Sequence, residues 1–356
     1  MSNLVFVLGA GASMHMGAPG MGRFFEKADQ LSDEFHDDVT CRIEREQVNR
    51  AMCKLQDAHS KANIELSNLE SVMSAFEMAD LLRIAPSDEN GTLVVAIKRL
   101  IAWTLDHSML YAFKDGSIVT TETYRHFAEM IARLSRQQSP KHICTVVTFN
   151  YDLALDLALH SAGVTPNIGF DPSVSGRVNL LKLHGSLGWH ECGNSTCGKI
   201  ATLALPRLER HYETVPMTWS KLSTYLTNGA LPPRCQKCNS QLSNDVVIIP
   251  PSWNKGQYRT ELANVWRTAA QELGRATDII VCGYSFPQTD SFFRDLYGLS
   301  TIGSPPLKTF WVIDPNKEVE SRYHEMLGPG TRPNFKFLQC PFETGVGFIE
   351  NRFRRP

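Results

Sequence analysis

The sequence predicts an α/β fold with a doubly wound parallel sheet. The chain contains short, nearly continuous apolar runs that are rich in β-branched residues, and helix-like stretches lie between several of them. Continuous rather than alternating apolarity indicates strands buried on both faces, as in a parallel sheet. Alternation of such strands with helices is typical of Rossmann-like domains. The predicted strands span 4–8, 143–148, 178–183, 246–249, 278–282 and 309–313, and the predicted helices span 152–162, 258–273 and 290–299.

Composition and charge narrow the class of protein. The 356 residues include 42% hydrophobic and 21% charged residues, with a formal net charge of −1, so we expect one globular domain over 1–356. A nearly neutral chain is not typical of a dedicated nucleic-acid binder, and we expect no direct nucleic-acid binding. No apolar run reaches the roughly 18 to 20 residues of a membrane helix. The first apolar run ends in a glycine turn, which predicts a buried strand rather than a signal peptide. We therefore expect a cytoplasmic protein without membrane contact.

Two stretches interrupt the alternation of strands and helices. The first, 24–140, is mostly helical and is predicted to be a helical insertion. The second, 188–245, carries four clustered cysteines and has no long periodic segment. The apolar stripes that predict core-facing helices in the insertion are Leu66, Leu69, Val72, Met73 and Phe76, followed by Leu93, Ile97, Leu100, Ile101 and Leu105.

A glycine-rich turn follows the first predicted strand. It reads Gly9-Ala10-Gly11-Ala12-Ser13, and glycine lets the backbone turn sharply and approach a phosphate without a Cβ in the way. A helix that began there would direct its free N–H groups at the anion. Met14 stands where the usual dinucleotide fingerprint has a third glycine, so a plain strand-to-helix turn stays open as the alternative.

Polar side chains follow two of the predicted strands. Asn150 and Asp152 come just after 143–148, and His184 follows 178–183. Ligand sites of open α/β sheets gather at the carboxyl ends of strands, and a histidine there can act as a general base near neutral pH. A helix N-cap at Asn150 and a structural role for His184 are the alternatives.

The four clustered cysteines form two close pairs. Cys192 and Cys197 are separated by four residues, and Cys235 and Cys238 by two. Spacings of two to four residues are typical of the knuckles of a structural zinc site, which four thiolates close completely. The sequence therefore predicts a zinc module over 188–245 in which the metal is structural rather than catalytic.

Taken in order, the motifs GAGAS, TFNYD at 148–152, LHGS at 183–186 and GYSF at 283–286 resemble those of the sirtuins, a family of NAD-binding enzymes. The resemblance implies a sirtuin-like catalytic domain in which Asn150 holds the nicotinamide ribose or a water, Asp152 recognises the carboxamide and His184 is the base. It also implies residues that bind the rest of the dinucleotide: Gly9, Ala10, Gly11, Ala12 and Ser13 at the pyrophosphate, and Gly283, Ser285 and Asn316 on the adenosine side.

Three departures from the sirtuin pattern affect the expected function. Gly17-Ala18-Pro19-Gly20-Met21-Gly22 replaces a stretch that carries an acid, an aromatic residue and an arginine in deacetylases. Phe149 stands in place of a glutamine. In deacetylases one segment pairs with the acyl-lysine peptide. The corresponding segment here is 247–253, and it contains two consecutive prolines, which cannot donate main-chain hydrogen bonds. The NAD side of the site is retained, whereas the peptide side is not.

With these departures the chain is similar to bacterial sirtuin-like NADases of antiphage defence. The resemblance then implies hydrolysis of NAD as a substrate to nicotinamide and ADP-ribose, in the bacterial cytoplasm, with control by homo-oligomerisation or by a separate partner such as a HerA-type ATPase. The alternatives are an NAD-dependent protein deacylase and a catalytically silent subunit that binds NAD or ADP-ribose.

Overall fold

The computed structural model describes residues 2–35, 39–56, 66, 68–84, 92–115, 117–138, 142–171, 173–174, 176–202, 215–226, 234–249, 260–287 and 291–354. Among these residues, no helix is both long and apolar enough to span a membrane.

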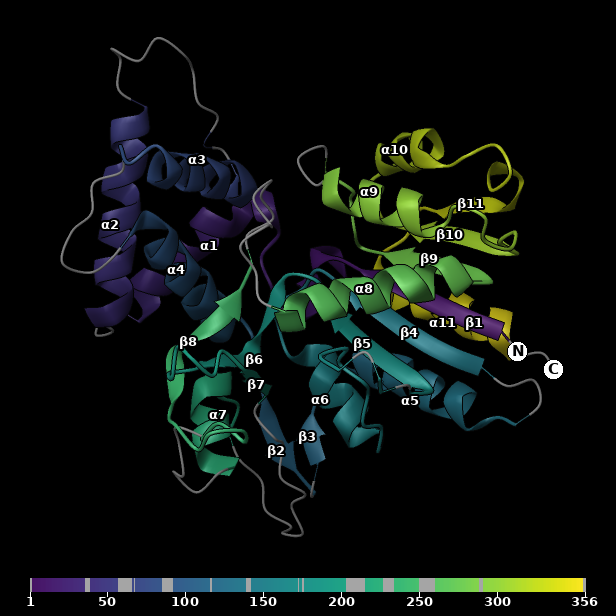
Figure 1. The fold of residues 1–356 in the computed structure, drawn as a ribbon, viewed down its shortest axis with the longest axis horizontal. Helices are drawn as coiled ribbons and strands as arrows, with labels where there is room; N and C mark the ends of the chain where they lie inside the picture. Colours follow the sequence, from purple (N-terminus) through teal and green to yellow (C-terminus); the bar gives the residue numbers. More distant parts are fainter. Residues whose placement is uncertain are drawn as a thin grey trace.

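A six-stranded parallel sheet forms the centre of the molecule (Figure 1). Its strands, in spatial order, are β11 (Phe335–Leu338), β10 (Thr309–Ile313), β9 (Asp278–Cys282), β1 (Ser2–Leu8), β4 (His142–Thr148) and β5 (Val178–Lys182). From β1 the chain first adds β4 and β5 on one side and later adds β9, β10 and β11 on the other. This reversal confirms the predicted doubly wound fold and places its switch point beside β1.

Alternate residues of the strands pack against two helical layers. On β1, Phe6 belongs to the core that contains Phe127 of α5 (Glu122–Arg136), whereas Val7 belongs to the core that contains Val265 of α8 (Thr260–Arg275). Helices α6 (Ala154–Ser161) and α11 (Phe342–Phe353) share the first side, and α9 (Ser291–Ser300) and α10 (Val319–Met326) share the second. Burial on both faces explains why β1, β4, β5, β9 and β10 are nearly continuously apolar.

The carboxyl ends of the central strands lie level with one another. Leu8 pairs with both Thr148 and Cys282, Thr148 pairs with Lys182, and Cys282 pairs with Ile313. The residues that follow each strand therefore emerge along one edge of the sheet, although they are far apart in the sequence.

The prediction for 246–249 was correct about a strand but wrong about its sheet. β8 (Leu242–Ile248) pairs antiparallel with β6 (Gly185–Cys192), which also pairs with β7 (Ile200–Thr202). Gly185 makes this possible, because its φ of +87° turns the chain and a Cβ there would lie 2.9 Å from the carbonyl carbon of Val247. The sixth position of the main sheet is taken instead by β11.

The helical segment after the glycine turn contains α1 (Phe24–Glu34), α2 (Val39–Leu55), α3 (Leu69–Leu81) and α4 (Leu93–Ser108). Both predicted apolar stripes are buried in the core. A short hairpin, β2 (Ala112–Lys114) and β3 (Ser117–Val119), then leads to α5, which packs on β4. In Figure 1, α1–α4 and the β6–β8 sheet with α7 (Trp219–Leu226) lie on the side of the main sheet opposite the start of β1.

Candidate functional site

The glycine turn packs directly against the turn after β9. The N–H of Gly9 donates to Cys282 O at 3.1 Å, and the N–H of Gly11 donates to Gly283 O at 2.9 Å. A Cβ on Gly9 would lie 2.6 Å from Gly283 O, and one on Gly283, whose φ is +59°, would lie 2.5 Å from Gly11 C. These glycines are therefore required for backbone packing at the switch point, whatever they bind.

The expected helix does not follow the turn. Two 3-10 turns, Ala10–Ala12 and Met14–Met16, occupy this stretch. The N–H groups of Ala12 and Ser13 donate to Gly9 O and Ala10 O within the turn. Of the five N–H groups from Gly9 to Ser13, only that of Ala10 has no acceptor among the described residues, and it is the one available to an anionic ligand.

Asn150 connects the end of β4 to the glycine turn. Its side-chain Nδ2 donates to Gly9 O and to Ser13 Oγ, both at 3.0 Å. The carbonyl of Gly9 can only accept, so the NH₂ end of the amide must face the turn. Asn150 is therefore not a helix cap, and its Oδ1, which has no donor among the described residues, is left as an acceptor.

Asp152 stabilises the start of α6. Its Oδ1 accepts the N–H of Ala154 at 2.9 Å, and the side chain is buried. Lys182, on β5, donates to the main-chain carbonyl of Asp152 and lies 2.8 Å from the carboxylate of Asp156. This buried lysine was missed from the sequence, although a lysine inside an apolar strand usually signals a buried charge pair.

Asn150 and Asp152 both line a small cavity of about 30 Å³ at the carboxyl ends of the strands. This volume is well below the roughly 300 Å³ or more of small-molecule sites, so a ligand can enter only if the cavity opens. Ala10 lines it too. The helical segment supplies apolar walls, among them Leu69 of α3, which begins at that residue because Asn68 accepts the N–H of Ser71. The strand ends therefore supply the polar groups of the cavity, and the helical segment supplies its apolar wall.

His184 is buried but does not line that cavity. Its ring packs against Phe149 with centroids 5.0 Å apart and against Tyr151 at 6.1 Å. Phe149 and Tyr151 do line the cavity. The rings of Phe149 and Tyr151 therefore lie between His184 and the cavity. A ligand in the cavity can reach His184 only if one of these rings moves or if the ligand approaches from another side.

The residues expected on the adenosine side lie at the adjacent strand ends. Ser285 and Asn316 are exposed, and Gly283 is half-buried. Asn316 Oδ1 accepts the N–H of Glu318 at 3.0 Å, and Arg322 donates to Ser285 O at 3.1 Å. These residues follow β9 and β10 on the same edge of the sheet as Gly9 and Asn150.

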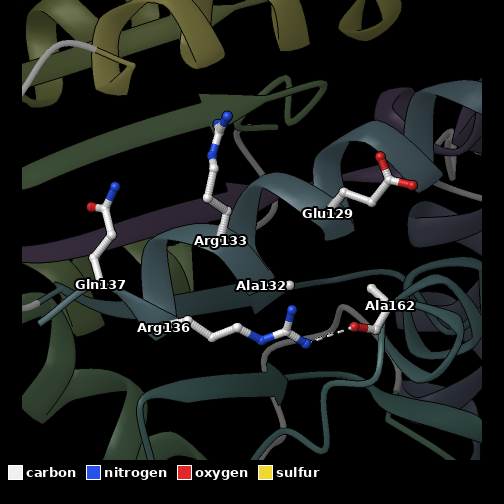
Figure 2. Close-up of a pocket in the computed structure, with 6 residues that line it drawn as sticks. All are labelled: Glu129, Ala132, Arg133, Arg136, Gln137 and Ala162. Atoms are coloured by element: carbon white, nitrogen blue, oxygen red, sulfur yellow. Dashed lines mark hydrogen bonds between the residues drawn. The ribbon is translucent and has the colours of Figure 1, made fainter.

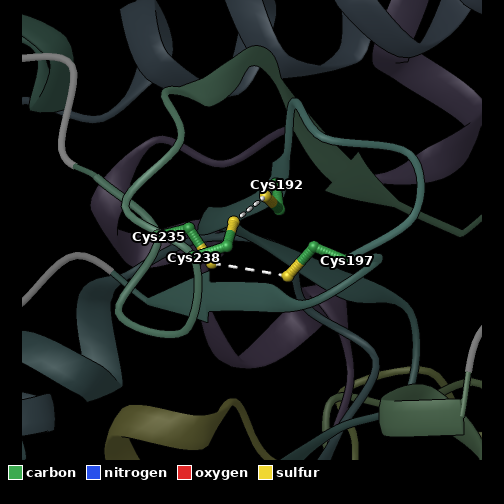
Figure 3. Close-up of side chains that lie close together, drawn as sticks. All are labelled: Cys192, Cys197, Cys235 and Cys238. Carbon is green, nitrogen blue, oxygen red and sulfur yellow. Dashed lines mark hydrogen bonds between the residues drawn. The ribbon is translucent and has the colours of Figure 1, made fainter.

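The four predicted cysteines come together (Figure 3). All four Sγ atoms lie within 4.8 Å of one another, with Cys192 3.4 Å from Cys238 and Cys197 3.8 Å from Cys235. Tetrahedral zinc with Zn–S bonds of about 2.3 Å separates its sulfurs by about 3.8 Å. Hydrogen bonds from the hydroxyl and N–H of Ser240 lower the pKa of Cys238, which favours the thiolate that a metal requires. The cluster fits a closed structural zinc site.

A second cavity lies beside α5 and is lined by Glu129, Ala132, Arg133, Arg136, Gln137 and Ala162 (Figure 2). It is at the end of α5 that precedes β4, opposite the carboxyl ends of the strands. Arg136 donates to Ala162 O at 3.2 Å, and Arg133 lies 3.3 Å from Glu350. Both guanidinium groups already have protein acceptors, and no predicted site residue lies there.

No protein-family model matches the chain, and no curated protein matches it by sequence. One similar solved structure is a complex of ADP-ribose with a Sir2 homologue that carries a serine substitution, and it is 16% identical to this chain. The match covers 99% of this chain and 91% of that chain, with a TM-score of 0.42. A structure described for the mechanism and regulation of Sir2 enzymes is 16% identical, with 99% and 93% covered and a TM-score of 0.41. A complex of Sir2 with a p53 peptide and NAD+ is 13% identical, with 98% and 92% covered and a TM-score of 0.37. These values are too low to assign an activity to this chain.

Proposed function

We propose that the chain hydrolyses NAD+ to nicotinamide and ADP-ribose. The observation that carries this proposal is the cavity in which Ala10, Asn150 and Asp152 meet. It offers one free N–H for a phosphate, one fixed amide acceptor and one buried acid, with apolar walls beside them. Those groups match the phosphate, ribose and carboxamide of a nicotinamide nucleotide.

The reaction breaks the bond between nicotinamide and ribose. Nicotinamide leaves as a neutral base, so its departure needs little acid assistance, and positive charge develops on the ribose. In the proposed mechanism Asn150 Oδ1 accepts a hydrogen bond from the attacking water or from a ribose hydroxyl. Asp152 holds the carboxamide, and His184 takes the proton that the water or the hydroxyl loses. The cavity of about 30 Å³ must open to admit a nucleotide, and His184 lies behind Phe149. We therefore propose that ring movement accompanies substrate binding.

Protein deacylation requires an acylated peptide to reach the same site. An added peptide strand needs main-chain donors and acceptors that are not already used. Ile249, just beyond β8, donates its N–H to His184 O at 2.8 Å, and its carbonyl accepts from Tyr151 Oη at 3.0 Å. The paired prolines at 250 and 251 lie outside the described residues. The internal bonds of Ile249 support hydrolysis over deacylation.

Purified protein incubated with NAD, with and without an acetyl-lysine peptide, separates these functions. We expect nicotinamide release at the same rate in both reactions. Release only with the peptide would establish a deacylase. Binding of NAD without any release would establish a catalytically silent subunit.

We further propose that this activity depletes NAD in the bacterial cytoplasm during phage infection, under the control of a homo-oligomer or a HerA-type ATPase partner. An enzyme that consumed NAD without control would harm its own cell. Cellular NAD should fall after infection only in cells that carry an active copy. A constant NAD level in infected cells would contradict this role.

A further inference from the structure

Tyr124 lies outside every motif discussed above, yet its hydroxyl reaches the glycine turn. It lies in the first turn of α5 and is 1% exposed. Its Oη is 2.8 Å from Ser13 Oγ, and Ser13 is itself fully buried. Tyr124 does not line the cavity, so it cannot act on a ligand directly.

Ser13 connects Tyr124 to Asn150. Asn150 Nδ2 donates to Ser13 Oγ at 3.0 Å, in addition to its bond to Gly9 O. A serine hydroxyl has three rotamers available, and the bond to Tyr124 selects the one in which Oγ accepts from the amide. Two acceptors, rather than one, then fix the plane of the Asn150 side chain.

The N-terminal end of α5 is anchored to the same segment at a second point. Thr121 occupies the N-cap position of α5, but its side chain does not cap the helix; its Oγ1 lies 2.8 Å from His15 Nε2. The ring of Tyr124 also packs against His15 and Phe342, with centroids 5.2 Å and 5.7 Å apart. The phenol therefore has a fixed position relative to the glycine turn.

We infer that Tyr124 is a positioning residue, which acts through Ser13 to hold the amide of Asn150 with Oδ1 directed to the substrate. Burial raises the pKa of Tyr124 well above its ordinary value, so the hydroxyl stays protonated at any working pH. The expected effect of Tyr124 on kcat rests on the proposed NAD hydrolysis. Its expected effect on the orientation of the Asn150 amide does not depend on that activity.

Two readouts test the inference, with Tyr124→Phe as the variant. Tyr297→Phe is the matched control, because Tyr297 is another buried tyrosine but lies on α9 at the opposite face of the sheet. The first readout is the side-chain ¹⁵N–¹H signal of Asn150, assigned by its loss in Asn150→Ala. The second is the separate measurement of kcat and KM for nicotinamide release.

In Tyr124→Phe we expect the Asn150 amide signals to shift and kcat to fall about tenfold with KM within about twofold, because misplacement of a group acting in the transition state lowers kcat. Tyr297→Phe should change neither. Ser13→Ala should act like Tyr124→Phe, and the two should not be additive when combined. Unchanged Asn150 signals in Tyr124→Phe, or equal losses of kcat in both tyrosine variants, would overturn the inference. If the wild-type protein released no nicotinamide, the proposed function would fail, and the amide signals alone would decide the role of Tyr124.

Discussion

The rings of Phe149 and Tyr284 stack face to face, with centroids 4.2 Å apart and planes inclined by 10°. One residue follows β4 and the other follows β9, so the stack spans the strand β1 that separates them. Phe149 also contacts His184 and Phe293, with centroids at 5.0 and 5.5 Å. An apolar aromatic cluster therefore surrounds Phe149, the residue that the motif resemblance aligns with a glutamine.

Phe149→Gln tests this cluster. The substitution loses the ring contacts and buries an amide among aromatic rings, so we expect it to lower the free energy of unfolding by about 3 kcal/mol. Phe149→Leu, which keeps the site apolar, should cost about half as much. Urea denaturation of both variants provides the measurement. Equal stabilities for Gln and Leu at this position would show that the cavity wall tolerates a polar group.

Gly283→Ala tests the contact between the two turns. The new Cβ would lie 2.5 Å from Gly11 C at a residue whose φ is +59°, so we expect a loss of more than about 2 kcal/mol of stability. Gly298→Ala is the matched control, because nothing lies within 4 Å of a Cβ there and the residue is inside α9. Alanine should stabilise that helix by about 0.5–1 kcal/mol. Thermal melts of the two variants that moved in the same direction would contradict this account of the glycine turn.

Metal analysis tests the cysteine cluster. We expect one zinc per chain in the purified protein and its loss in Cys235→Ser, because the remaining three thiolates no longer close the tetrahedral site. Cys144→Ser, at a buried cysteine of β4 outside the cluster, should retain the metal. Elemental analysis of both variants gives the answer. Full zinc occupancy in Cys235→Ser would exclude this ligand set.

Three partly or fully buried histidines make stability depend on pH. Burial lowers the pKa of His15, His142 and His190 below the ordinary value of 6.5. The unfolded chain therefore binds protons more readily than the folded chain, so stability is full above about pH 6.5 and falls as the pH drops through the folded pKa values. In His15→Gln the loss of stability between pH 7.5 and 5.5 should be smaller. Urea midpoints at both pH values measure this, and an equal loss in the variant and the wild type would exclude His15 as a contributor.

Much of the sheet could be predicted because strands buried on both faces leave a continuous apolar signal. β11 could not, because it is an edge strand whose sequence, Phe335-Lys336-Phe337-Leu338, places a lysine among apolar residues. β8 gives an apolar signal at 246–249, but nothing in that signal indicates which sheet it joins. The turn at Gly185 decides this, and a positive φ is not visible as periodicity.

The sequence predicts only part of the candidate site, because some of its contacts depend on how distant segments pack. Motifs at strand ends predict that Asn150 and Asp152 lie at one edge of the sheet, because topology brings such ends together. The cluster of cysteines was predicted from the spacing of its two pairs. The contact of Tyr124 with Ser13 joins residues 111 positions apart and depends on how α5 packs on the sheet. The position of His184 behind Phe149 likewise depends on side-chain packing that no local pattern encodes.

The most direct test of the account is the mass of the products formed from NAD by the purified protein without any peptide. We expect nicotinamide and ADP-ribose in equal amounts. Asn150→Ala and His184→Ala should each lower the rate by about a hundredfold or more while circular dichroism shows a folded protein. Absence of ADP-ribose from the wild-type reaction, or wild-type turnover by either variant, would contradict NAD hydrolysis at this site.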